Sequence, residues 1–312
     1  MSSTTPARPL SITAVFPQLA PLARTATRLH PRAGSPSPHS SSIGGPLLWP
    51  AADPWPHCDG PHAPDGVPPT SLKDARLRQV TASQPWPEGP VPMLPVAQLR
   101  ARDIPTLRPP ADADLLQVLW CPFDHLPEPK PKTALFWRSA ATITDILVAP
   151  PEPEAVHPGY VPEPCVITPE EVTEYPNPME LSGELQQQLA DWAAWRAAGA
   201  VVDSYYEPAP QEFYRNELSI APGWKSAGWT RWGLTDPIHQ TCRICAAEMA
   251  PLLTIATAEW DDTTRSWTPY EGQAIADPGA AHPTRIEIAG GYDLQLYVCP
   301  TSPGHPHTAL IQ

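Results

Sequence analysis

Four residues near the C-terminus have the types and the spacing of a zinc site. Cys242 and Cys245 are separated by two residues, Cys299 ends a later apolar run, and His305 follows Cys299 in the next loop. Thiolates and imidazoles in this arrangement are typical ligands of structural zinc, and four protein ligands leave no coordination position for water or substrate. His307 is the alternative fourth ligand. A redox-active dithiol and a set of buried, reduced thiols are the competing interpretations.

A second set of cysteines and histidines occurs in the N-terminal half. Cys58 and Cys121 are each followed four positions later by a histidine, His62 and His125. The two pairs predict a Cys2His2 zinc site at a place equivalent to the first, with His57 as the alternative to His62. The competing interpretation is a pair of buried thiols accompanied by surface histidines.

The segments that must position these ligands are repeated within the chain. Residues 116–122 match 294–300, and residues 93–99 match 249–255 in the same order. If 251–256 pairs antiparallel with 294–299, Cys299 returns beside Met249 and therefore beside the Cys-x-x-Cys pair. We interpret the repeat as an internal duplication. It predicts that the two halves superpose, with Cys121 and Cys299 at equivalent strand ends.

A shorter sequence motif supports the same internal duplication. Ser-Ile-Gly at 42–44 precedes Cys58 by the sixteen residues that also separate Ser-Ala-Gly at 226–228 from Cys242.

The stretch Ser-Ile-Gly-Gly-Pro-Leu-Leu-Trp-Pro at 42–50 resembles the signature of the YwqG-like family, a group of bacterial proteins without an established activity. The strands that follow the signature in that family correspond here to 95–99 and 115–120. The resemblance covers most of residues 25–312 and implies an internally duplicated α+β fold. It also makes a role in neutralising or escorting a protein partner conceivable. This chain departs from the simplest members in its cysteines and in a proline-rich insertion after Cys58.

The predicted fold class is α+β, with two similar, mostly antiparallel sheet halves, one long connecting helix and many proline-rich loops. Residues 1–10 are expected to be a disordered leader, 11–176 the first half, 177–200 the connecting helix, and 201–312 the second half with the zinc knuckle. In the connecting helix Asn177 can cap the first turn, the leucines between 181 and 189 form an apolar stripe, and Gly199 ends the helix. The 47 prolines predict that other helices are short.

The charge balance argues against one large class of partner. The chain has 33 acidic and 20 basic side chains and a net charge of −13, whereas nucleic-acid binding requires clustered Lys and Arg. No apolar run approaches the eighteen residues of a membrane span, so no membrane association is expected. Cysteines spaced for metal rather than for a disulfide framework favour a reducing compartment, which we expect to be the cytoplasm.

Two further clusters are candidates for binding chemistry. Trp224, Trp229 and Trp232 could form a stacking platform for a sugar or base, although such residues more often cover the edge of a sheet. Glu259, Asp261 and Asp262 could chelate a cation or act as paired carboxylates, although a solvated turn is the simpler interpretation.

The main functional expectation is a non-catalytic, zinc-stabilised binding or protein-interaction module with an unknown protein partner. The sequence contains no Gly-x-Ser-x-Gly elbow, phosphate loop, dinucleotide fingerprint or His-Glu-x-x-His helix. The alternative is a hydrolase-type enzyme with its site in the cleft between the halves. Asp236, His239 and Glu259 are the candidate polar residues for that cleft.

Overall fold

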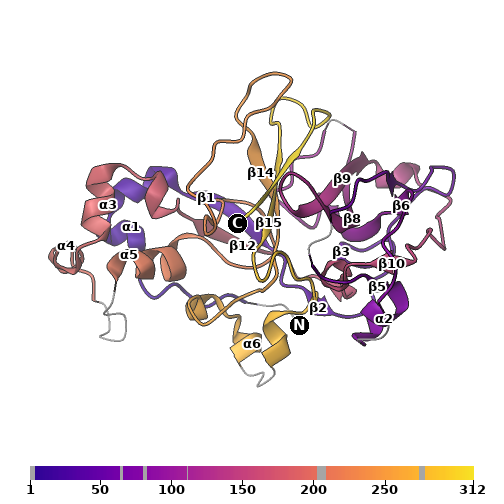
Figure 1. Ribbon diagram of the computed structural model, residues 1–312. Helices are drawn as coiled ribbons and strands as arrows, with labels where there is room; N and C mark the ends of the chain where they lie inside the picture. Colours follow the sequence, from indigo (N-terminus) through magenta and orange to yellow (C-terminus); the bar gives the residue numbers. More distant parts are fainter. Residues whose placement is uncertain (1–3, 64–65, 80–82, 111, 202–208, 274–277) are drawn as a thin grey trace.

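A computed structural model describes residues 4–63, 66–79, 83–110, 112–201, 209–273 and 278–312. Short helices and antiparallel sheets make up an α+β fold, as predicted (Figure 1). The α-helices are α1 (Ile12–Val15), α2 (Leu72–Leu77), α3 (Gly183–Leu189), α4 (Trp192–Ala197), α5 (Pro210–Phe213) and α6 (Tyr270–Gln273). The 3₁₀ turns are η1 (Pro17–Leu22), η2 (Ala140–Thr142), η3 (Pro158–Tyr160), η4 (Pro178–Glu180), η7 (Arg265–Trp267) and η8 (Pro278–Ala281), and η6 (Tyr214–Ser219) is a π-helical turn. In the described part of the chain, no helix has the length and apolar character needed to cross a membrane.

Twelve of the strands form two six-stranded sheets. One sheet has the order β12-β1-β13-β14-β15-β16, from β12 (Glu170–Glu174), β1 (Arg24–Arg28), β13 (Lys225–Ala227), β14 (Ala250–Ile255), β15 (Leu294–Val298) and β16 (Thr308–Ile311). The other has the order β2-β11-β3-β7-β8-β9, from β2 (Arg32–Ala33), β11 (Cys165–Val166), β3 (Ser42–Ile43), β7 (Leu94–Arg100), β8 (Leu115–His125) and β9 (Lys130–Arg138). Two small ribbons pair β10 (Ala155–Val156) with β5 (Thr70–Ser71) and β4 (His57–Cys58) with β6 (Val91–Pro92).

The central strands of the two sheets share one register. Gln98 of β7 pairs with Gln117 of β8, and Thr254 of β14 pairs with Gln295 of β15. A register shift follows the proline in both hairpins, between residues 95 and 97 and between residues 251 and 253. The two sheets are also alike in the order of their strands. That this likeness arose by duplication stays a prediction.

The neighbouring strands are offset by one residue from the sequence match. Ile43 lies opposite Ala97, whereas Ser226, two residues before Gly228, lies opposite the equivalent Leu253. The structure therefore aligns Gly44 with Ala227, and both have a left-handed backbone, with φ of 61° and 59°.

The chain crosses between the sheets twice. β1 and β2 are three residues apart but lie in different sheets, and so do β11 and β12. The sheet that contains β13 to β16 therefore also contains β1 and β12, which come from residues before 177. The predicted domain ranges 11–176 and 201–312 thus do not coincide with the two sheets. The physical reason is that β13 needs a partner for its backbone N–H and C=O groups, and β1 supplies it through pairs such as Ala26 with Ala227.

One hydrophobic core lies between the two sheets. Residues of both central hairpins, including Leu116 of β8 and Leu294 of β15, belong to the same buried cluster. Because successive strand residues point to opposite faces, Cys121 and Cys299 lie instead in two separate outer clusters. Each predicted metal site is thus on the outer face of its own sheet.

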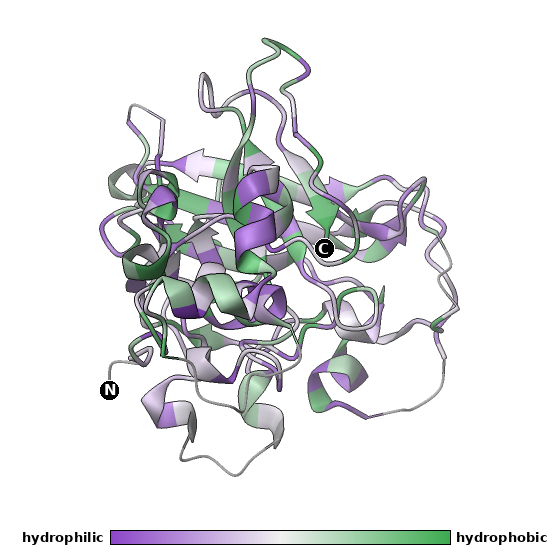
Figure 2. Cartoon of the chain, turned by 90° about the vertical axis from the view of Figure 1, so that its left-hand side faces the viewer, coloured by the Kyte–Doolittle hydropathy of each residue, from purple (hydrophilic) through white to green (hydrophobic). Residues whose placement is uncertain are grey.

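The helices α1, α3, α4 and α5 gather at one end of the molecule, beside the sheet that contains β1 (Figure 1). Seen from that end, they carry alternating hydrophilic and hydrophobic bands (Figure 2). Their apolar side chains, among them Leu185, Leu189, Trp195 and Phe213, form a second core.

The single long helix predicted for 177–200 is wrong, because this segment forms η4, α3 and α4. The capping box of Asn177 and Glu180 is present but serves only the 3₁₀ turn. Asp191 has an extended backbone and its side chain accepts the Ala193 N–H at 2.8 Å, so it caps a new helix rather than continuing the old one.

The disordered leader predicted for 1–10 also differs from the structure over residues 4–10. The Thr5 N–H bonds to the Glu170 carboxylate at 3.0 Å, and the Arg8 guanidinium lies 3.5 Å from the Trp267 ring centroid. Hydrogen bonds and a cation–π contact hold a segment that lacks apolar mass.

Candidate metal centres

The structure brings the eight predicted cysteines and histidines together in two groups of four. In each group the ligand atoms, one per residue, all lie within 4.8 Å of one another. Around tetrahedral zinc, bond lengths near 2.3 Å for sulfur and 2.1 Å for nitrogen give sulfur–sulfur separations of about 3.8 Å and sulfur–nitrogen separations of about 3.6 Å. Both groups are therefore compact enough to hold one metal ion each.

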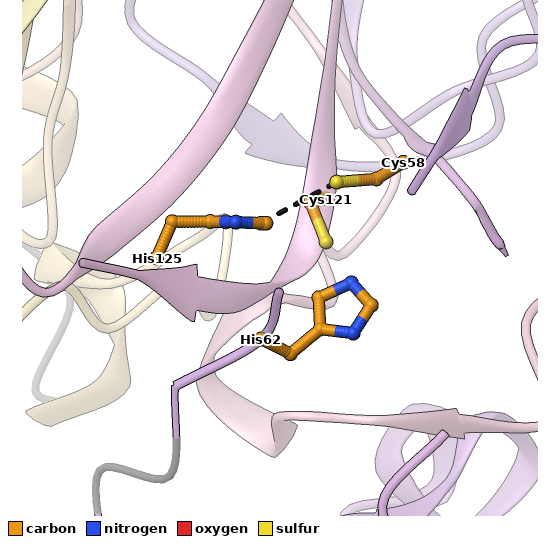
Figure 3. Close-up of side chains that lie close together, drawn as sticks. All are labelled: Cys58, His62, Cys121 and His125. Carbon is orange, nitrogen blue, oxygen red and sulfur yellow. Dashed lines mark hydrogen bonds between the residues drawn. The ribbon is translucent and has the colours of Figure 1, made fainter. Parts of the chain in front are cut away.

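The first centre joins β4, the loop after it and the end of β8 (Figure 3). β4 pairs with β6 so that Cys58 lies opposite Val91, which returns Cys58 to the start of β7 across the proline-rich insertion. Cys58 Sγ is 3.4 Å from His125 Nε2, and Cys121 projects from the outer face of β8. The β4–β6 ribbon is the contact that sequence spacing did not reveal.

His62 completes the first centre. A bridge between Ala63 and Asp124 places the His62 ring edge-to-face with the His125 ring, with centroids 5.3 Å apart. Nε2 of His62 is buried and has no hydrogen-bond partner among the described residues. A buried imidazole nitrogen in this state is costly unless a metal ion or water binds it. His57, the alternative ligand, is exposed and bonds to the Trp55 carbonyl instead.

The second centre is built on a knuckle between residues 240 and 249. The Cys242 N–H bonds to the Ala247 carbonyl, the Ala246 N–H to the Cys242 carbonyl, and the Met249 N–H to the Gln240 carbonyl. Ala246 has a φ of 57°, so the backbone reverses directly after Cys245. The knuckle leads straight into β14.

The remaining two ligands come from the end of β15 and the loop that follows. Cys242 Sγ is 3.4 Å from His305 Nδ1, and Cys245 Sγ is 3.4 Å from Cys299 Sγ. Cys242 and Cys299 are buried, whereas Cys245 is exposed. His307, the alternative ligand, instead makes a 2.7 Å hydrogen bond with Thr133 of β9.

The backbone around each thiol is arranged to stabilise negative charge on sulfur. Each of the five clustered cysteines accepts a hydrogen bond from the N–H two residues later in the chain. The donors are Gly60 for Cys58, Phe123 for Cys121, Ile244 for Cys242, Ala247 for Cys245 and Thr301 for Cys299. N–H donors of this kind favour the thiolate, which is the form that binds metal. The sequence prediction missed these donors, because any residue other than proline supplies one.

Hydrogen bonds within both centres favour the thiolate at two positions, Cys58 and Cys299. The Cys121 thiol is the main cause that lowers the pKa of Cys58 to about 3. Burial raises the pKa of Cys299, but hydrogen bonds from the Ser302 N–H and from His305 lower it to about 6. The bond to Cys299 in turn raises the pKa of His305.

Cys165 shows how a structural thiol differs. It is buried in β11 and donates to the Pro283 carbonyl at 3.4 Å. Burial, followed by the charge of Glu163, raises its pKa to about 12. Cys165 lies in neither group and is an internal reference for the five clustered cysteines.

Comparison with protein-family models and with curated proteins found no match. The resemblance to the YwqG-like family therefore stays a prediction, as do the protein partner and the cytoplasmic location.

The three candidate tryptophans are mainly packing residues, which is the interpretation that the sequence favoured over a stacking platform. Trp224 is buried and its indole donates to the Ala256 carbonyl at 3.0 Å, and Trp232 is also buried. The Arg24 guanidinium covers Trp229, 3.4 Å from its ring centroid.

The candidate polar residues of the alternative enzyme do not converge. Asp236 and His239 are exposed, and the nearest acidic partner of His239 is Glu248 at 3.4 Å. Glu259 is buried elsewhere, where it accepts the Trp224 N–H at 2.9 Å.

Asp261 and Asp262 belong to the turn that the simpler interpretation predicted. Asp261 accepts hydrogen bonds from the N–H and hydroxyl of Thr263, and Asp262 pairs with Arg265 at 3.1 Å.

Proposed function

We propose that this chain is a non-catalytic binding or protein-interaction protein of the YwqG-like kind, stabilised by two structural zinc ions. One observation carries the proposal: each centre brings together four cysteine and histidine side chains whose ligand atoms, one per residue, all lie within 4.8 Å of one another. Zinc held by four protein ligands has no open position at which water or substrate could be activated.

The donor set favours zinc over other metals. Thiolates with imidazole suit zinc, whereas magnesium and calcium take oxygen ligands. A redox dithiol would use only two of the four side chains in each centre and would leave the converging histidines unexplained.

The placement of the centres gives zinc a structural role. Each ion would tie a loop to the outer face of a sheet, in a chain whose 47 prolines limit regular structure. Structural zinc contributes roughly 10 to 16 kcal/mol of apparent binding free energy in small peptides, which is comparable to the whole stability of a domain, about 5 to 15 kcal/mol.

Metal analysis of the purified chain tests this proposal. We expect two zinc ions per chain for the natural sequence and one for each of the variants Cys121→Ser and Cys299→Ser. Cys165→Ser is the matched control and should keep two. A natural chain with less than one equivalent of zinc would refute the zinc centres.

Cobalt substitution separates a closed site from an open one. Cobalt(II) in four-ligand thiolate sites should show the absorption of tetrahedral coordination, and azide should leave that spectrum unchanged because no position is free. An azide-dependent change would favour the alternative, a hydrolase-type metal site.

A further inference from the structure

Two hollows meet at a pair of arginines that the sequence did not single out. The first has a volume of about 720 Å³ and lies between Asp124, His157 and the segment 285–290. The second has a volume of about 590 Å³ and is lined by Trp260 and by residues of the segments 30–33, 269–272 and 279–285. Arg78 and Arg285 line both hollows, so the pair stands where the hollows join.

Each arginine is supplied by a different half of the chain. Arg78 caps the C-terminus of α2, and its guanidinium donates to the Pro158 and Val161 carbonyls at 3.2 and 2.9 Å. Arg285 comes from the later segment 284–287, which is joined to 159–163 by bonds from the Glu287 N–H to the Gly159 carbonyl and from the Glu163 N–H to the Thr284 carbonyl. These two backbone hydrogen bonds bring Arg285 close enough for its charge to act on Arg78.

Among the described residues, neither arginine forms a direct ion pair with an acidic side chain. Burial is the main cause that lowers the pKa of Arg78; the charge of Glu163 raises it, and the charge of Arg285 lowers it by less than Glu163 raises it. Arg285 is exposed, and its side chain forms no ion pair or hydrogen bond with the described residues, while its backbone N–H bonds to the His282 carbonyl. Bringing two like charges together is unfavourable, and an anion between them would reverse the sign of that interaction.

Backbone strain is concentrated at the same place. Arg78, Arg285, Ala289 and His30 have φ values of 53°, 56°, 46° and 46°, and each lines one or both hollows. A left-handed backbone at non-glycine residues costs free energy and persists where the surrounding structure requires it, often at ligand sites.

We propose that Arg78 and Arg285 bind the oxyanion of a small organic ligand, a carboxylate or a phosphate, whose remaining part occupies an adjoining hollow. Guanidinium groups match both oxyanions through paired N–H donors. Acidic groups limit the charge that the site accepts: Glu163, Glu259 and Glu271 border the second hollow, and Glu287 borders the first. Asp124, also in the first hollow, already accepts the Tyr160 hydroxyl at 2.6 Å. Trp260, Pro269 and Pro283 offer an apolar surface to the organic part.

Isothermal titration at constant ionic strength tests the site. Inorganic phosphate and succinate are titrated separately, so that the two oxyanion sources are distinguished. We expect the natural chain to bind at least one of them and Arg285→Gln to bind it at least tenfold more weakly. Glutamine keeps a side chain at the same φ without the charge, and an unchanged melting temperature would show that the variant folds.

Arg265→Gln is the matched control, because Arg265 is an exposed arginine of the same half that pairs with Asp262. It should bind the oxyanion like the natural chain. The proposal is overturned if the natural chain binds neither probe, or if Arg285→Gln and Arg265→Gln have the same affinity as the natural chain. Zinc content is expected to stay at two ions in both variants, so failure here is distinct from failure of the zinc centres.

Discussion

Glu174 and Glu259 are two buried carboxylates that hold the backbone of the second half. Glu174 accepts the Ala221 and Trp229 N–H groups and the Lys225 ammonium. Glu259 accepts only the Trp224 N–H through one oxygen, and its other oxygen has no partner among the described residues. Burial therefore raises the pKa of Glu259 to about 7.

This difference predicts a pH dependence for Glu259. Its folded-state pKa lies above the unfolded value, so its stability contribution is complete below about pH 4.5 and is lost as the pH rises to about 7. Relative to the natural chain, Glu259→Gln should gain roughly 2 to 3 kcal/mol of unfolding free energy between pH 5 and pH 8. Urea unfolding of both proteins at the two pH values measures the gain. Exposed Glu184→Gln should show none, and an equal response of both variants would contradict the assignment.

At the scale of single elements, the knuckle between residues 240 and 249 contains one strained residue. Ala246 has a φ of 57° where a glycine would be unstrained. Ala246→Gly should therefore raise the unfolding free energy by about 0.5 to 1 kcal/mol, after the entropic cost of glycine is subtracted. Ala247→Gly is the control at an ordinary φ and should lower it. Chemical denaturation of the zinc-loaded variants is the measurement, and a loss of stability in Ala246→Gly would show that the knuckle has another shape.

The break between α3 and α4 depends on one cap. Asp191 accepts the Ala193 N–H at 2.8 Å, so Asp191→Ala should cost about 1 kcal/mol of unfolding free energy. Asp191→Asn keeps an acceptor oxygen and should cost less. If Asp191→Ala instead stabilised the chain, residues 183–197 would favour the continuous helix that the sequence pattern predicts.

At the scale of the whole molecule, the shared core couples the two centres. Because β8 and β15 bury residues in the same cluster, the two sheets share one core, although each also has an outer cluster of its own. Loss of zinc from the second centre in Cys299→Ser should therefore lower the melting temperature of the entire chain in one transition. Calorimetry should show a single peak, and hydrogen exchange should increase together in β8 and β15. Two separated peaks, with β8 still protected, would mean that the halves fold independently.

The sequence by itself determined the chemistry of the two centres and the pairing of the central strands. Cysteine and histidine types at fixed spacing predicted the two groups that could hold a metal ion, and the repeated motifs at 93–99 and 249–255 align their strands with the later repeats. These signals are local, because each depends on residues that are close in sequence or on a direct match between two segments.

Only the tertiary structure decided which segments share a sheet and which arginines share a cleft. The exchange of β1 and β12 into the second sheet and the approach of Arg78 to Arg285 join residues more than a hundred positions apart. Such contacts satisfy backbone donors and bury surface that becomes available only after the chain has folded, so they leave no periodicity or spacing in the sequence. The sequence analysis did not single out Asp191, because an aspartate is compatible with a helix interior as well as with a helix start; its extended backbone in the structure decided between them.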